Sequence, residues 1–185
     1  MDMRIAQIVY FDKPGAANTD ATLQAVNERL KTGDIHHVVV ATNTGATALR
    51  AAEVLQAPEV RICGVHHQSS QWGRDARARP DPEQLERARR LGVTFVPDSP
   101  AVTYFRQIKG ESAETLRKLG QGIKVAVEVV LMAAQTGLIQ TGQIVIGVGG
   151  TGRGADAAIV CTATTPDKVG KLFIREILAK PIAPA

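Results

Sequence analysis

Short β-like runs alternate with segments of helical period along the first half of this sequence, and this alternation restricts the fold more than any other feature. The runs are apolar and rich in Val and Ile, which is typical of strands buried on both faces. Strand–helix repetition of this kind predicts a parallel sheet with helices on both of its faces. The expected strands are 6–11, 36–42, 60–66 and 93–97, and the expected helices are 18–33, 45–56 and 81–92.

The expected helices carry start and stop residues at their ends. Asp81 is the expected N-cap of the third helix, a proline follows it at the first helical position, and Gly92 suits the end. Asn18 or Thr19 is the expected N-cap of the first helix, and Gly33 is its expected end.

A long helical region is expected after these elements, over residues 99–137. Within 123–134 only Lys124 and Glu128 are polar, so we expect this helix to be buried around most of its circumference. A Lys–Glu pair at this spacing could position a ligand, although a paired structural feature is the more ordinary interpretation.

Two β-like runs near the end of the chain, 142–150 and 155–164, flank a glycine-rich loop and predict a hairpin. The segment 166–180 predicts a last helix that is capped at Thr165. No linker or repeat interrupts the 185 residues, which is a length that suits one domain. We therefore expect one α/β domain over 1–185, a three-layer sandwich with a mostly parallel central sheet, helices on both faces and a C-terminal antiparallel hairpin.

Composition argues against several classes of partner. The net charge is +4 and much of the basic density lies in 73–92, but aromatic residues make up only 4% of the chain, so a solvated surface is favoured over nucleic-acid binding. No apolar stretch is long enough for a bilayer, and no signal peptide is apparent, so no membrane partner is expected. Cys63 and Cys161 lie apart in β-like runs, which predicts buried free thiols, no metal site and a cytoplasmic location.

The glycine-rich stretch "GVGGTGRGAD", residues 147–156, is a candidate binding site. It contains a G-x-G-x-x-G pattern, but a dinucleotide fingerprint needs a helix after its glycines. A strand is expected here, so the pattern does not indicate a nicotinamide site. A loop of this kind can instead bring backbone amides together around an anion, with Arg153 suited to bidentate phosphate contacts. A long turn in which glycine serves backbone geometry alone is an equal alternative. The candidate residues are Gly149, Gly150, Thr151, Gly152, Arg153 and Gly154.

Two further loops are expected at one edge of the sheet, where ligands of parallel α/β proteins bind, and the glycine-rich loop could reach this edge. The loop after the second strand leads into a helix, whose N-terminal amides and dipole favour an anion, although simple capping by Thr44 would use the same residues. Its candidates are Thr42, Asn43, Thr44, Gly45, Ala46 and Thr47. The loop after the first strand offers Lys13, Asn18 and Thr19.

Aromatic and imidazole rings give a weaker signal. His66 follows the third strand and could contact a ligand on the same edge, although a polar strand end is the more ordinary interpretation. Tyr104 and Phe105 could stack on a ligand ring, with core packing as the alternative.

The sequence resembles a family of stand-alone proteins similar to the C-terminal α/β domain of pyruvate kinase. The stretches that carry the resemblance are "YFDKPGAANTDATL", "VVVATNTGATAL", "LGQGIKVAVEVVLMAAQTGLI" and "IGVGGTGRGADAAIV". In pyruvate kinases with a sugar-bisphosphate site, two loops similar to "ATNTGATA" and "GGTGRGAD" hold the phosphates. The resemblance therefore favours phosphate contacts by Thr42, Thr44, Gly45, Thr47, Gly150, Gly152 and Arg153.

The resemblance also implies a ligand. Stand-alone members of this kind are found with flavin mononucleotide (FMN), so FMN is the expected cofactor, and a flavin-dependent oxidoreductase of unknown substrate would follow if the protein is an enzyme. A non-enzymatic effector module for a phosphorylated sugar or nucleotide is the alternative, and a domain without a working site is a third. Pyruvate kinase activity is not expected, because that enzyme needs a barrel domain for which these 185 residues leave no room. No residue is assigned a catalytic role, and a homo-oligomer is expected.

Overall fold

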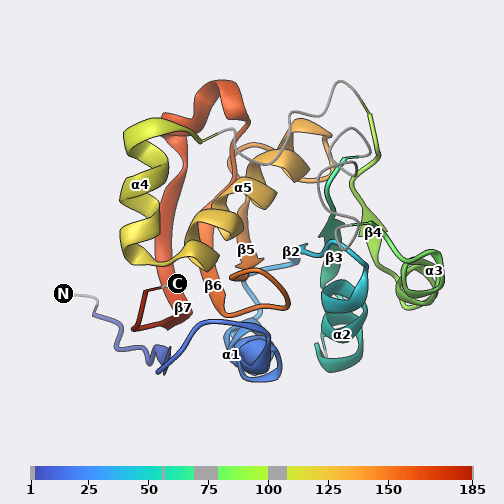
Figure 1. Cartoon of the computed structure of the whole chain (residues 1–185), viewed down its shortest axis with the longest axis horizontal. Coiled ribbons are helices and arrows are strands. Elements are labelled where there is room, and N and C mark those ends of the chain that lie inside the picture. Colours follow the sequence, from blue (N-terminus) through green and yellow to red (C-terminus); the bar gives the residue numbers. More distant parts are fainter. Residues whose placement is uncertain (1–2, 56, 69–78, 100–107, 185) are drawn as a thin grey trace.

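The central sheet has seven strands in a computed structural model that describes residues 3–55, 57–68, 79–99 and 108–184. The strand order is β1-β7-β6-β5-β2-β3-β4, and most of it can be followed across Figure 1. The strands are β1 (Val9–Phe11), β2 (His37–Ala41), β3 (Arg61–Val65), β4 (Thr94–Phe95), β5 (Ile144–Gly149), β6 (Ala157–Thr162) and β7 (Phe173–Pro181).

One strand runs against all the others. β6 is antiparallel to both of its neighbours, β5 and β7, whereas the remaining neighbouring pairs are parallel. The β5–β6 hairpin pairs Ile144 with Thr162 at one end and Gly149 with Ala157 at the other. The prediction of a mostly parallel sheet with an antiparallel hairpin is therefore confirmed.

The helices cover both faces of the sheet, as the strand–helix alternation predicted. Side chains alternate between the two faces along each strand. Val39 and Val145 belong to the apolar cluster that contains α5, whereas Val38, Val40 and Ile146 belong to the cluster that contains α1. Figure 1 shows α4 and α5 together, apart from α1 and α2. The helices are α1 (Thr19–Leu30), α2 (Ala46–Val54), α3 (Pro82–Arg90), α4 (Gly110–Leu119) and α5 (Gln121–Gln135), with short 3-10 helices at Ala16–Asn18 and Pro166–Lys171.

The predicted helix ends agree with the structure where glycine or aspartate signals them. Asp81 accepts a hydrogen bond at Oδ1 from the amide of Glu83 over 3.0 Å, which caps α3. Gly33 and Gly92 follow α1 and α3 with φ angles of 76° and 90°, a left-handed conformation that glycine adopts without strain. Asn18 occupies the N-cap position of α1, but its side chain makes no capping hydrogen bond.

The prediction of a last helix over 166–180 is wrong. A 3-10 helix is followed there by β7, which pairs with β6 on one side and β1 on the other. Because β6 is buried over most of its length, its backbone groups on the β7 side need partners, and β7 supplies them. The segment contains Ile174 and Ile177, which suit a strand, so this pairing overrides its local helical propensity.

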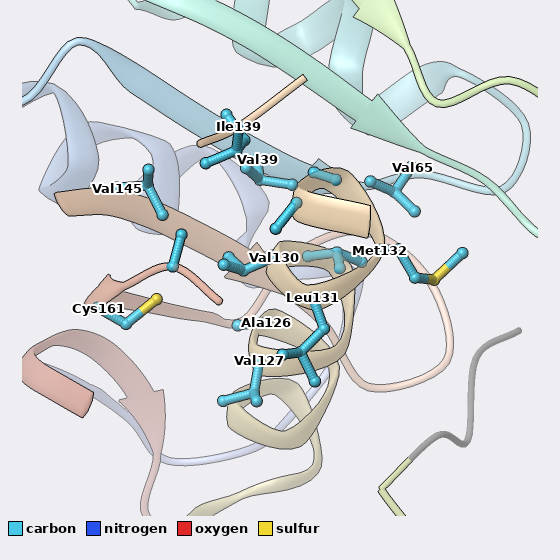
Figure 2. Packing of buried hydrophobic residues seen from close by; sticks show 14 of the residues in the cluster. Val39, Val65, Ala126, Val127, Val130, Leu131, Met132, Ile139, Val145 and Cys161 are labelled. Atoms are coloured by element: carbon cyan, nitrogen blue, oxygen red, sulfur yellow. The ribbon is translucent and has the colours of Figure 1, made fainter. Parts of the chain in front are cut away.

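The α5 helix is buried around most of its circumference, as predicted. Figure 2 shows Ala126 and Val130 of this helix on the side where strand residues such as Val145 and Cys161 lie. Ala126, Val130 and Leu131 are each 0% exposed. This helix and the sheet together form the largest apolar cluster of the described residues.

The two cysteines are buried free thiols, as predicted. Burial raises the pKa of Cys63 and of Cys161 to about 12, because the thiolate is poorly solvated inside the protein. None of the helices in the described part of the chain combines the length and apolar character that a membrane span needs.

Candidate functional site

Three loops with predicted site residues follow parallel strands and so lie at one edge of the sheet, which we call the carboxyl edge. The first loop, residues 12–18, follows β1. The second loop, residues 42–45, follows β2, and the glycine loop, residues 150–156, follows β5. The β2–β5 register places Val40 beside Val148, so the second loop and the glycine loop leave neighbouring strands at the same level.

The first loop and the glycine loop are joined by hydrogen bonds. The amide of Gly15 donates to Oδ2 of Asp156 over 2.8 Å, and the amide of Ala155 donates to the hydroxyl oxygen of Thr19 over 3.0 Å. Gly154 has a φ of 66°, and a side chain there would collide with the Thr19 hydroxyl, so the contact requires glycine. From the sequence, the glycine loop was expected only to be within reach of the edge that carries the first loop, and the structure brings the two loops into direct contact.

Asp156 lies at the centre of this contact and was missed by the sequence analysis. Its side chain is completely buried, and its Oδ2 also accepts the amide of Thr151 over 3.2 Å. Its other oxygen, Oδ1, has no hydrogen-bond partner among the described residues and lies against Gly122 in the first turn of α5. The only signal in the sequence is one carboxylate at the start of an otherwise apolar run, "ADAAIV".

The second loop has the geometry of a capped helix start. The hydroxyl oxygen of Thr42 accepts the amide of Ala48 over 3.4 Å, and that of Thr44 accepts the amide of Ala46 over 3.3 Å. The N-cap position itself is Gly45, with a φ of 100°, instead of Thr44 as expected. Both hydroxyl groups use an oxygen lone pair in these contacts and keep their hydrogen for donation to another group.

The remaining residues of the second loop differ in exposure. Asn43 is half-buried, Ala46 is exposed and Thr47 is buried. Thr42 is linked to the next strand, since its amide donates to the carbonyl of Val65 over 2.8 Å. Within the described residues no hydrogen bond joins the second loop to the glycine loop directly.

Two cations at this edge lack an ion-pair partner among the residues that the structure describes. Lys13 in the first loop and Arg153 in the glycine loop are both exposed, and neither side chain makes a hydrogen bond there. The carbonyl of Lys13 accepts a hydrogen bond from the Asn18 side chain over 2.8 Å, which holds the first loop in a turn. In the same part of the structure the amides of Gly152 and Gly154 donate to no group.

The glycines around the start of the loop have a packing role. A methyl group on Gly149 would collide with the carbonyl oxygen of Gly122 and lie 2.5 Å from the amide nitrogen of Ala126, both in α5. A methyl group on Gly150 would likewise collide with the backbone carbonyl oxygen of Gly154. The G-x-G-x-x-G pattern thus includes a glycine that α5 requires, and β6 follows the loop as a strand, as predicted.

His66 follows β3 at the same edge but is buried. Its ring centroid lies 6.3 Å from that of Phe95, and its Nδ1 lies 2.9 Å from the carbonyl oxygen of His67. Tyr104 and Phe105 lie outside the described residues. Among those described, no three His, Cys, Asp or Glu side chains come together as metal ligands would.

Comparison with known proteins adds one finding. The family model described as "Pyruvate kinase, alpha/beta domain" matches residues 20–161. The match begins in α1 and ends in β6, so it includes the second loop and the glycine loop but neither the first loop nor β7. The seven-stranded sheet with helices on both faces is consistent with the fold of that domain.

Proposed function

Because the chain belongs to the pyruvate kinase alpha/beta domain family, we propose that it binds a phosphate-bearing ligand at the carboxyl edge, with FMN as the preferred ligand. The observation that carries the proposal is the pair of exposed cations, Lys13 and Arg153, on two loops that are hydrogen-bonded to each other. A phosphate dianion would give these two exposed cations an anionic partner.

The donors at this edge suit a phosphate group. Arg153 has a planar guanidinium that can bind two phosphate oxygens at once. The free amides of Gly152 and Gly154 lie on either side of it in the sequence. Thr42 and Thr44 keep their hydroxyl hydrogens for donation, as described above. Together these groups would hold the phosphate through charge-assisted and neutral hydrogen bonds.

The choice of FMN among phosphorylated ligands follows from the resemblance noted above. The described residues fit the phosphate end of that molecule. A bound flavin would supply redox chemistry of its own, and the roles proposed for this chain are to bind the phosphate and orient the cofactor. We do not expect pyruvate kinase activity, and we assign no catalytic residue.

A phosphorylated sugar or nucleotide effector is the second candidate. The observation that favours it is that the second loop and the glycine loop, both with donors, follow neighbouring strands at the same level. Two loops in that arrangement suit a ligand with two phosphate groups. Such a module would respond to its ligand without transforming it.

We also propose that the chain forms a homo-oligomer through the edge strand β1. Met3, Ile5 and Tyr10 are exposed apolar side chains in and before this strand. A strand edge that pairs antiparallel with its own copy gives a two-fold symmetric interface. Light scattering after size-exclusion chromatography measures the mass, and Ile5→Asp should lower it if the interface lies here.

Absorption spectroscopy and ligand titration test the ligand proposal. Freshly purified protein should show a flavin spectrum or quench FMN fluorescence on titration. Arg153→Ala should weaken FMN binding roughly 10- to 100-fold, since a hydrogen bond to a charged group is lost. Arg61→Ala is the matched control, because Arg61 is exposed at the start of β3, at the opposite edge of the sheet.

The outcomes separate the two candidates. A colourless protein that ignores FMN but gains thermal stability with a sugar bisphosphate supports the effector module. A protein that responds to neither ligand contradicts the proposed phosphate site. Equal FMN affinity in Arg153→Ala and Arg61→Ala removes Arg153 from the site.

A further inference from the structure

We propose that Asp156 is a positioning residue for the ligand site: its buried carboxylate fastens the first loop to the glycine loop and thereby fixes Lys13 relative to Arg153. This inference rests on the function proposed above. Asp156 itself is completely buried, so it would act through the two loops instead of by touching the ligand.

The hydrogen bonds to Asp156 hold the first loop against the glycine loop. One oxygen, Oδ2, accepts amides from two different loops, Gly15 at 2.8 Å and Thr151 at 3.2 Å. Gly15 lies two residues after Lys13, and Thr151 lies two residues before Arg153. A shift of this one oxygen would therefore move both cations relative to each other.

The second oxygen gives a reason for a charged carboxylate at this position. Oδ1 is buried and finds no hydrogen-bond partner in the part of the chain that the structure describes, which is costly for a polar atom unless another interaction compensates. It lies against Gly122 in the first turn of α5, where backbone amides lack intrahelical partners and the helix dipole is positive. No side chain from the described ranges makes a capping hydrogen bond at this helix start. The carboxylate of Asp156 thus lies beside the positive end of the α5 dipole.

Close packing keeps the carboxylate in this place. A methyl group on Gly122 would collide with Oδ1, and the backbone of Asp156 is held by its amide, which donates to the carbonyl of Gly149 over 3.0 Å. Asp156 therefore joins three elements, which are the first loop, the glycine loop and α5. Lys13 and Arg153 are exposed on this buried support.

Asp156→Asn tests the proposal because it keeps the size of the side chain and removes its charge. An asparagine oxygen can still accept one or both loop amides, but its NH2 group would then face the amides of α5. Asp81→Asn is the matched control, since Asp81 also accepts two backbone amides at a helix start but lies outside the contact between the first loop and the glycine loop. The full-length chain is used throughout.

The first measurement compares FMN with riboflavin, which lacks the phosphate. Asp156→Asn should weaken FMN binding about tenfold and leave riboflavin binding unchanged, because only the phosphate contacts depend on the loop spacing. Lys13→Ala should weaken FMN binding in the wild-type background and have little further effect in Asp156→Asn, since coupled residues are not additive. Equal losses for FMN and riboflavin, or additive effects of the two changes, would overturn the proposal.

The second measurement is amide hydrogen exchange by NMR without ligand. The amides of Gly15 and Thr151 should exchange faster in Asp156→Asn than in wild type, whereas Asp81→Asn should leave both rates unchanged. Unaltered exchange at both amides in Asp156→Asn would overturn the proposal. If wild-type protein binds neither flavin, FMN is not the ligand, and the exchange rates alone then decide whether Asp156 holds the loops together.

Discussion

Arg29 on α1 makes a two-point contact with the carboxylate of Glu176 on β7, with 3.0 Å from Nε to Oε2 and 2.9 Å from Nη2 to Oε1. The Arg29 side chain is only 6% exposed, and the same guanidinium binds Asp34 over 2.7 Å. The contact joins the first helix to the strand that replaces the expected last helix. The C-terminal strand is thus held to the domain by charge as well as by pairing in the sheet.

Replacing Arg29 by alanine should destabilise the protein strongly. The change removes the buried cation from two carboxylates, and breaking a buried ion pair on one side costs about 3 kcal/mol. For a chain of this length that loss lowers the melting temperature by roughly 6 to 12 °C. Arg50→Ala is the control for thermal unfolding followed by circular dichroism, because Arg50 pairs with Asp20 at the surface and should contribute less than about 1 kcal/mol. Equal losses in the two variants would contradict the role of the buried contact.

Because of Asp34, the free energy of unfolding should depend on pH in the acid range. Hydrogen bonds from Arg29 and then from the Thr32 hydroxyl hold the pKa of Asp34 well below its ordinary value in the folded protein. An aspartate in the unfolded chain has a pKa of about 3.9. The stabilisation of the folded protein by ionised Asp34 is therefore complete above that pH and is lost as the pH falls towards the folded pKa.

Urea unfolding measured over a series of pH values tests this dependence. The free energy of unfolding should fall from about pH 4 downward in the wild type, and it should fall less steeply in Asp34→Asn. Glu59→Gln, at an exposed carboxylate, is the control and should keep the wild-type slope. An unchanged slope in Asp34→Asn would show that this carboxylate does not contribute.

The fold could be predicted as far as local patterns determine it. The first six strands lie within the predicted runs because each run is apolar along its own length. β7 could not be predicted in this way, since its partners β6 and β1 decide its conformation. A segment with Gly170, charged residues and isoleucines can form a helix or a strand. Only the unpaired edge of β6, which the sequence does not reveal, decides for the strand.

The candidate site, like the fold, could be predicted only in part. The predicted loops lie at one edge because the strands before them are parallel, and parallel strands follow from the alternation of elements. Asp156 could not be found, because its main partner, Gly15, is 141 residues away and contributes only a backbone amide. When the hydrogen-bond donors to a buried carboxylate are backbone amides, no residue type or sequence spacing marks them.

Lys124 and Glu128 should depend on each other. The structure pairs them as the spacing suggested, with 2.5 Å between Nζ and Oε1, and their side chains are only 4% and 1% exposed. Lys124→Met should cost about 3 to 5 kcal/mol, because it leaves the Glu128 carboxylate buried without its cation. The double variant Lys124→Met, Glu128→Leu should recover much of that loss. Denaturant unfolding of the single and double variants gives the coupling energy, and simple additivity would show that the pair does not act as a unit.

Gly149→Ala should separate the packing role of the glycine motif from ligand binding. The added methyl group would meet the carbonyl of Gly122 and lie 2.5 Å from the amide of Ala126, and neither backbone group can move unless α5 shifts away from β5. We expect a loss of about 3 kcal/mol, at the upper end for overpacking, because the obstacle is backbone and not a flexible side chain.

Gly170→Ala is the matched control for this change. No heavy atom of the described residues lies within 4 Å of the position that a methyl group on Gly170 would take, so the change should alter stability by less than about 0.5 kcal/mol. Denaturant unfolding without any ligand compares the two variants. If Gly149→Ala is as stable as Gly170→Ala, then α5 does not require a glycine there, and the conformation of the glycine loop would be the remaining explanation for the motif. A large loss confined to Gly149→Ala would instead mean that part of the apparent dinucleotide motif exists because a helix crosses the strand too closely for any side chain.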